Sequence, residues 1–183
     1  MSLHSLLHSA IRWNRKPLLE ERLRFERLLS ELSAGLIRVA AKDIDGALER
    51  GLHQVITFLR VDRGDLDEFA GGETGIRVAL APQGMEKSVR VIDADQFPWA
   101  AERLRRGDVV RFSGLEKLPN EAVIDRANFR RAGIRSHVSL PLRAGGPVLG
   151  VLSFSSVFAE RAWSDELVDR LHHLSQAFAS ALE

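Results

Sequence analysis

The sequence predicts an α+β fold in which an antiparallel sheet is covered by helices from both ends of the chain. Apolar residues recur at helical spacing over residues 18–41 and again over 164–182. Between these segments lie short apolar runs separated by Gly and Pro, a pattern typical of strands joined by hairpins. Because isolated helices of this length are marginal in water, the terminal helices should bury their apolar stripes on one face of the sheet.

Length and composition indicate one globular domain. The chain has 183 residues, of which 45% are hydrophobic and 28% are charged. It contains no Cys, which excludes disulfides, thiolate metal sites and thiol nucleophiles. The longest apolar run, 147–154, is far shorter than the ~20 residues of a membrane-spanning helix, and no secretion signal is evident. We therefore expect a cytoplasmic protein that does not enter a membrane.

The first helix carries the strongest periodicity in the chain. We expect it to start at Pro17, which divides the chain into an N-terminal extension or linker, 1–17, and a single domain, 18–183. Its apolar residues follow a heptad seam, made of Phe25, Leu29, Leu32, Leu36 and Val39. This seam predicts a homodimer through the terminal helices, or else a stripe that covers the sheet of a monomer. The basic excess near the N-terminus is typical of a solvated linker, so no nucleic-acid contact is expected.

The middle of the chain alternates short strands with short helices. A second helix should run from Asp43 to about Leu59, and two strands, 66–70 and 76–81, should be joined by a turn at Gly71 and Gly72. The first of these strands, 66–70, is charged enough to be an edge strand or a poor strand, and the carboxylates of "DRGDLDE", 62–68, favour a solvated loop. The remaining expected elements are a helix from Pro98 to Gly107, the strand "VVRF", a helix from Pro119 or Asn120 to Gly133, and a last helix capped by Ser164.

Residues 134–156 predict a hairpin whose strands mix serines with apolar residues. Val138, Leu140 and Leu142 should share one face of the first strand, while His137, Ser139 and Pro141 share the other. Which half of the second strand joins His137 is left open by the sequence. A buried hydroxyl without a partner costs about 1–3 kcal/mol, so these serines either bond locally or line a pocket.

A resemblance extends over residues 24–182. It is carried by "RFERLLSELSAGLI" at 24–37, "VDR" at 61–63, "FPW" at 97–99, "GDVVRFSGLEKLP" at 107–119, "AGIRSHVSLPLRAGGPVLGVLSFSS" at 132–156 and "ERAWSDELVDRLHHLSQAFASAL" at 160–182. This series resembles a GAF domain of a bacterial signalling protein. The resemblance implies a six-stranded antiparallel sheet, with terminal helices on one face and short helices and loops over a pocket on the other. It also implies an output domain in the parent chain, either a histidine kinase or an AAA+ activator that serves an alternative sigma factor.

Several chemistries known in that family are disfavoured here. Without Cys, neither bilin attachment nor thiol redox catalysis is possible within this chain. The family's cyclic-nucleotide signature is not evident, and a haem would depend on His137 alone, for which a satisfied strand histidine is the better interpretation. No metal-ligand set or catalytic constellation is evident either. The cofactor therefore stays unknown, and no enzymatic activity is expected.

The predicted function is that of a non-catalytic sensory domain in signal transduction, which binds an unidentified small molecule and signals through its terminal helices. The alternatives are a purely structural dimerisation module and, less favoured, a small-molecule enzyme. Aromatic side chains should form the wall or lid of the pocket, and polar side chains should contact the ligand. The predicted ligand-binding residues are Phe97, Trp99, Phe112, Ser113, Phe129, Arg135, His137 and Ser139.

Overall fold

The computed structural model describes the backbone of residues 3–70, 73–84 and 89–183, and the side chains of 19–40, 42–69, 75–84 and 89–183. Its helices are α1 (Leu3–Ile37), α2 (Ile44–Leu59), α3 (Pro98–Arg106), α4 (Val123–Arg131) and α5 (Asp165–Leu182). Its strands are β1 (Arg63–Ala70), β2 (Glu73–Leu80), β3 (Val110–Phe112), β4 (Ser136–Leu142) and β5 (Gly150–Ser156). Short 3₁₀ turns precede α2 and α4.

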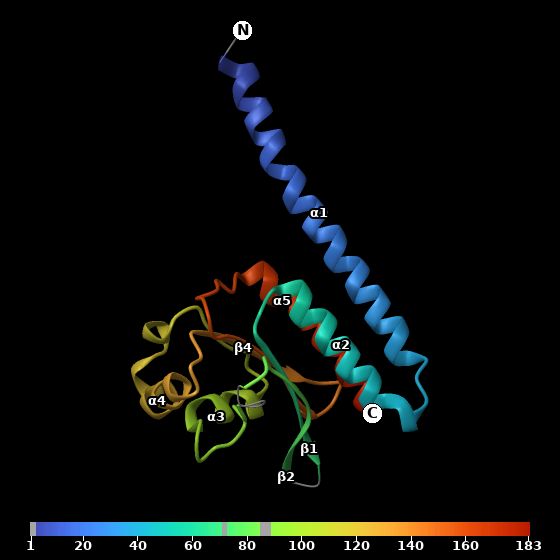
Figure 1. The fold of residues 1–183 in the computed structure, drawn as a ribbon, viewed down its shortest axis with the longest axis vertical. Coiled ribbons are helices and arrows are strands. Elements are labelled where there is room, and N and C mark those ends of the chain that lie inside the picture. The colour runs from blue at the N-terminus through green and yellow to red at the C-terminus, as the bar shows by residue number, and fades with distance from the viewer. Residues whose placement is uncertain (1–2, 71–72, 85–88) are drawn as a thin grey trace.

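A single antiparallel sheet with the order β2-β1-β5-β4-β3 forms the middle layer. Helices α1, α2 and α5 lie on one side of it, and α3 and α4 lie on the other (Figure 1). This α+β layering agrees with the fold class predicted from the sequence. The resemblance implied six strands, whereas the described residues contain five.

The helical face of the sheet is closed by apolar side chains. Alternate residues of β4 and β5, among them Leu140, Leu152 and Phe154, pack against the apolar stripes of α2 and α5. Side chains of a strand point alternately to its two faces, so this arrangement sends the intervening residues to the opposite side. The predicted helix cap is confirmed, because the Leu167 backbone N–H donates to Ser164 Oγ at 3.3 Å.

Helix α1 is longer than predicted. It begins at Leu3, so the predicted start at Pro17 is wrong, and its N-terminal part projects well beyond the body of the domain (Figure 1). Pro removes one backbone hydrogen bond, but the segment around it is rich in Leu, Arg and Glu, which are strong helix formers. Within the body, Phe25, Leu32 and Leu36 of the seam are buried against the same chain.

Strand β1 was predicted as an edge or a poor strand, and that prediction is wrong. It lies between β2 and β5, and β2 occupies the edge. Its acidic side chains Asp65 and Asp67 are buried instead of solvated. Both lie on a sheet face that carries other buried polar residues. The charges of this segment therefore indicate that this face is polar and do not indicate that the strand is exposed to solvent. The predicted turn at Gly71 and Gly72 lies outside the described residues.

Candidate functional site

Polar side chains form rows across the middle of the sheet on the face toward α3 and α4. In the first row His137 of β4 pairs with Ser155 of β5, which pairs with Arg63 of β1. In the second row Ser139 pairs with Ser153, which pairs with Asp65. All six side chains are buried. The register therefore settles the question left open by the sequence, since Ser153 and Ser155 share the face of His137.

Hydrogen bonds link the polar groups of β4 and β5. His137 Nδ1 lies 2.8 Å from Ser155 Oγ, and its Nε2 lies 2.6 Å from Ser139 Oγ. Ser139 Oγ in turn lies 2.7 Å from Ser153 Oγ. Burial, and then the positive charge of Arg63, lower the pKa of His137 to about 3, so its imidazole is neutral near pH 7. Because both ring nitrogens already have partners, His137 behaves as a satisfied strand histidine.

Aromatic rings cover this polar surface. The centroid of Phe129 lies 4.6 Å from that of Phe97, 4.8 Å from that of Phe112 and 5.2 Å from that of His137. All three phenylalanines are buried. They come from the start of α3, from β3 and from α4, so the cluster joins both short helices to the sheet. The structure thus brings together Phe97, Phe112, Phe129, His137 and Ser139 of the predicted set.

The other three predicted residues lie around this cluster. Trp99 is partly buried on α3, where the Arg103 guanidinium lies 5.1 Å from its ring centroid. Ser113 Oγ accepts the backbone N–H of Trp163 at 3.3 Å. Arg135 is exposed at the start of β4. The contacts of Trp99 and Ser113 support the fold around the cluster, and all three residues stay predicted ligand contacts.

Asp125 of α4 is a buried residue that the sequence analysis missed. Its carboxylate accepts the backbone N–H groups of Trp99 and Ala100, at 3.2 Å and 2.9 Å. These donors lie in the first turn of α3, where a helix has unpaired N–H groups and favours negative charge. Asp125 therefore fixes the start of α3 to α4, directly above the aromatic cluster.

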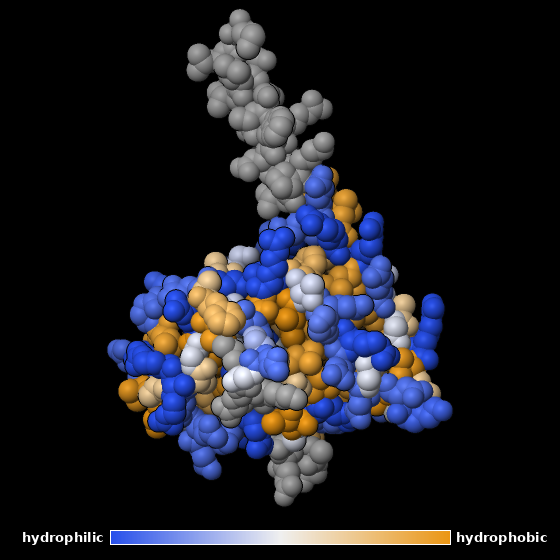
Figure 2. Space-filling model, viewed as in Figure 1, coloured by the Kyte–Doolittle hydropathy of each residue, from blue (hydrophilic) through white to orange (hydrophobic). Residues whose placement is uncertain are grey.

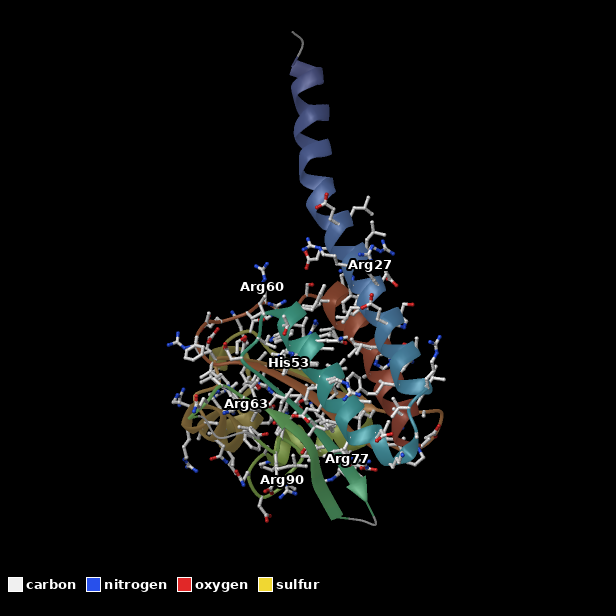
Figure 3. The ribbon with its side chains drawn as sticks, turned by 45° about the vertical axis from the view of Figure 1, so that its right-hand side comes forward. Arg27, His53, Arg60, Arg63, Arg77 and Arg90 are labelled. Carbon is white, nitrogen blue, oxygen red and sulfur yellow. The ribbon has the colours of Figure 1, made fainter. Side chains whose placement is uncertain are left out.

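Asp67 of β1 is a second buried carboxylate on the polar face of the sheet. It is fully buried, and neither carboxylate oxygen has a hydrogen-bond partner within the described part of the chain. Burial raises the pKa of Asp67 to about 7, although the charge of Arg90 acts to lower it. Figure 3 labels Arg90 and Arg63 on the side of the sheet away from α1. The alternating charges of β1 were the sequence signal for Asp67, and the sequence analysis interpreted those carboxylates as solvated.

A cleft of about 210 Å³ opens on the same side, between β2, the segment 89–97 and α4. Its polar lining consists of Arg90, Gln96, Asn128 and Arg131. Of the predicted ligand-binding residues, only Phe97 lines it. The cleft and the aromatic cluster therefore meet at Phe97. Among the described residues there is no group of three or more side chains arranged to hold a metal ion, and no helix is both long and apolar enough to cross a membrane.

Comparison with known proteins identifies the class. The family model of the GAF domain matches residues 43–182, which is most of the chain. The chain therefore belongs to the GAF domain family. No match was found among curated proteins.

Solved structures share the fold at low sequence identity. The phycocyanobilin-bound GAF domain of a cyanobacterial phytochrome has a TM-score of 0.69 and 14% identity, over 86% of this chain and 93% of that one. The GAF domain of the cyanobacteriochrome TePixJ has a TM-score of 0.63 and 16% identity, over 80% and 92% of the two chains. The GAF domain of a protein named as a sensor histidine kinase from Pseudomonas syringae pv. tomato has a TM-score of 0.62 and 17% identity, over 91% of each chain.

Proposed function

We propose that this GAF domain is a non-catalytic sensor that binds a small molecule on the α3 and α4 side of the sheet. The observation that carries the proposal is the concentration of buried polar groups on that face, with Arg63, Asp67 and His137 at its centre. Buried charges are costly, so a fold that only needed stability would fill these positions with apolar side chains. The bilin-bound GAF neighbour supports the proposal because its ligand is a small molecule.

The aromatic cluster is the proposed wall of the binding region. Phe97, Phe112 and Phe129 belong to three different elements, so a ligand that displaced one ring would move α3 and α4 relative to the sheet. Trp99, Ser113, Arg135, His137 and Ser139 remain proposed contacts around it. A bilin could not be attached covalently to a residue of this chain, because the chain has no Cys.

The signal would leave through the terminal helices of a homodimer. The buried seam of α1 is occupied within the chain, so the face offered to a second copy is a different one. Leu19 and Leu23 lie one turn apart on α1 and are each 57% exposed. Figure 2 shows hydrophobic surface where α1 leaves the body. In the parent protein we expect a cytoplasmic two-component kinase or an AAA+ transcription regulator as the output.

Sedimentation tests the dimer. The double variant Leu19→Glu/Leu23→Glu should be a monomer at concentrations where the wild type is a dimer, because it places charge in an apolar interface. Val123→Glu on α4, whose Val is 61% exposed, is the matched control and should leave the dimer intact. Leu32→Glu is unsuitable, since Leu32 is buried within its own chain. A monomeric wild type at high micromolar concentration would remove the dimer from the proposal.

Native mass spectrometry and thermal shift test ligand binding. The expected result is a retained small molecule, or an increase in melting temperature with at least one compound of a metabolite panel, because ligands that bind only the folded state stabilise it. A protein that retains nothing and responds to nothing would favour the structural alternative, in which the domain only dimerises.

A further inference from the structure

The lining of the cleft beside Phe97 indicates which chemical class of ligand the cleft can bind. Among the described residues, its lining contains two guanidinium groups, Arg90 and Arg131, and two side-chain amides, and none of these lining residues carries a carboxylate. The rest of its lining is apolar and consists of Ile76, Val89, Phe97 and Ala132. A cleft whose lining combines positive charge with apolar side chains suits an anion attached to a compact apolar group.

We propose that this cleft binds a small organic carboxylate, whose oxygens meet Arg90 and Arg131 and whose apolar part rests on Ile76 and Phe97. The inference rests on the proposed function and specifies the class of its ligand. Arginine suits this task because its planar guanidinium can donate two parallel hydrogen bonds to one carboxylate. At about 210 Å³ the cleft is below the ~300–1,000 Å³ of sites for drug-sized ligands, which favours a small compound.

The wall of the cleft is held in place by the fold. Asn128 Nδ2 of α4 donates to the Gln96 carbonyl at 2.6 Å, and Gln96 Nε2 donates to Asp93 at 3.2 Å. Arg105 of α3 donates to the Ile92 carbonyl at 3.0 Å. These bonds fasten the segment 89–97 to both short helices. The cleft is therefore formed before any ligand arrives, which lowers the ordering cost of binding.

Asp67 couples this cleft to the interior of the domain. It pairs across the strands with Ile76, which lines the cleft, and Arg90 is close enough to act on its ionisation. A carboxylate bound to Arg90 would add negative charge near Asp67 and draw on the same guanidinium. Ionisation of Asp67 would then become harder, so binding should be accompanied by proton uptake.

Other groups around Asp67 do not provide the same link. Arg63 and Asp65 share its face of β1, and His137 lies on β4 of the same face but is neutral near pH 7. The residues paired with Asp67 on β2 and β5 are Ile76 and Val151, which do not titrate. Arg90 is thus the charged group that belongs to the lining of the cleft and also acts on Asp67.

Titration calorimetry with benzoate and with its neutral isostere benzamide tests the carboxylate. Benzoate should bind and benzamide should not. Arg131→Gln should weaken benzoate binding about 10-fold, the loss expected for one charge-assisted hydrogen bond. Arg130→Gln is the matched control, because Arg130 is an exposed neighbour on α4 that does not line the cleft, and it should change nothing.

The pH dependence gives a second readout. Benzoate should bind about 10-fold more weakly at pH 8 than at pH 6, and Asp67→Asn should abolish this difference. Equal binding of benzamide, no binding of benzoate, or equal effects of Arg130→Gln and Arg131→Gln would each overturn the inference. The sensor proposal would survive any of these results if another compound of the metabolite panel stabilised the protein, so the two failures are distinguishable.

Discussion

The two faces of the sheet are built from the same strands but have opposite chemistry. On the helical face Phe154 and its neighbours are apolar and form one cluster with apolar side chains of α2 and α5. On the other face Ser155 and Asp67 alternate with them and are equally buried. Burying a Leu or Phe stabilises a fold by about 1.5–3 kcal/mol, whereas a buried polar group must find partners merely to break even.

The two faces therefore contribute to stability in different ways. The helical face contributes a large apolar cluster, whereas the opposite face combines a second apolar cluster, around Phe97, Phe112 and Phe129, with buried polar groups that offset part of its stabilisation. His137 and the serines recover their cost through mutual hydrogen bonds, while the carboxylate oxygens of Asp67 have no such bonds within the described part of the chain. The desolvation of Asp67 is thus not compensated by hydrogen bonds within the described residues, and its cross-strand partner Ile76 lines the cleft.

The first prediction compares the stability lost at two adjacent residues of β5, Phe154 and Ser155. Phe154→Ala should lower the free energy of unfolding by about 3–5 kcal/mol, because it leaves a cavity among the helices. Ser155→Ala should cost only about 1–2 kcal/mol, the loss of one hydrogen bond to His137. Urea unfolding of both variants measures the difference. Equal losses would mean that the two faces contribute equally to stability.

The second prediction concerns His137 and acid. Its folded pKa of about 3 lies below the unfolded value of 6.5, so its contribution is complete above pH 6.5 and is lost as the pH falls toward 3. Lowering the pH from 6.5 to 4.5 should therefore cost the wild type about 2–3 kcal/mol through this residue. In His137→Asn this part of the pH dependence should disappear. An unchanged profile in urea titrations would show that His137 titrates normally.

Asp67 should act in the opposite direction. Its folded pKa of about 7 lies above the unfolded value of 3.8, so its contribution is present at low pH and is lost as the pH rises toward 7. Between pH 5 and pH 7, Asp67→Asn should gain about 2–3 kcal/mol relative to the wild type. Near pH 5 the slopes of stability against pH that arise from Asp67 and His137 have opposite signs and cancel in the wild type. Only the single variants should therefore reveal the two pH dependences. If the free energy of unfolding of Asp67→Asn changed with pH in the same way as that of the wild type, this account would be wrong.

The sequence predicted the helical face better than the polar one, for a physical reason. Helical periodicity and caps report local chemistry, so the helices at 44–59, 98–106 and 165–182 and the hairpin at 136–156 were found from the residues themselves. The long reach of α1 was missed because Pro17 carries a strong local signal for a helix start that the surrounding helix formers outweigh.

The polar face depends on pairing between distant strands. "DRGDLDE" alternates charge with small or apolar residues, but only its position between β2 and β5 makes Asp65 and Asp67 buried. Likewise the capping of α3 by Asp125 and the lining of the cleft by Arg90 and Arg131 join segments that no local pattern connects. The burial of the aromatic residues around Phe129 could be predicted from sequence, because large apolar side chains are usually buried, but whether they contact a ligand stays a prediction.

The smallest expected effect tests whether the serines form a network or only occupy the same face. Ser139 Oγ and Ser153 Oγ lie 2.7 Å apart on neighbouring strands. Removing either hydroxyl leaves the other without that partner, at about 1–2 kcal/mol, whereas removing both also removes the unsatisfied group. The double variant Ser139→Ala/Ser153→Ala should therefore lose less than the sum of the single losses, by about 1 kcal/mol. Additive losses in urea unfolding would mean that the two serines are satisfied independently, and the polar face would then be a set of separate bonds and not one connected network.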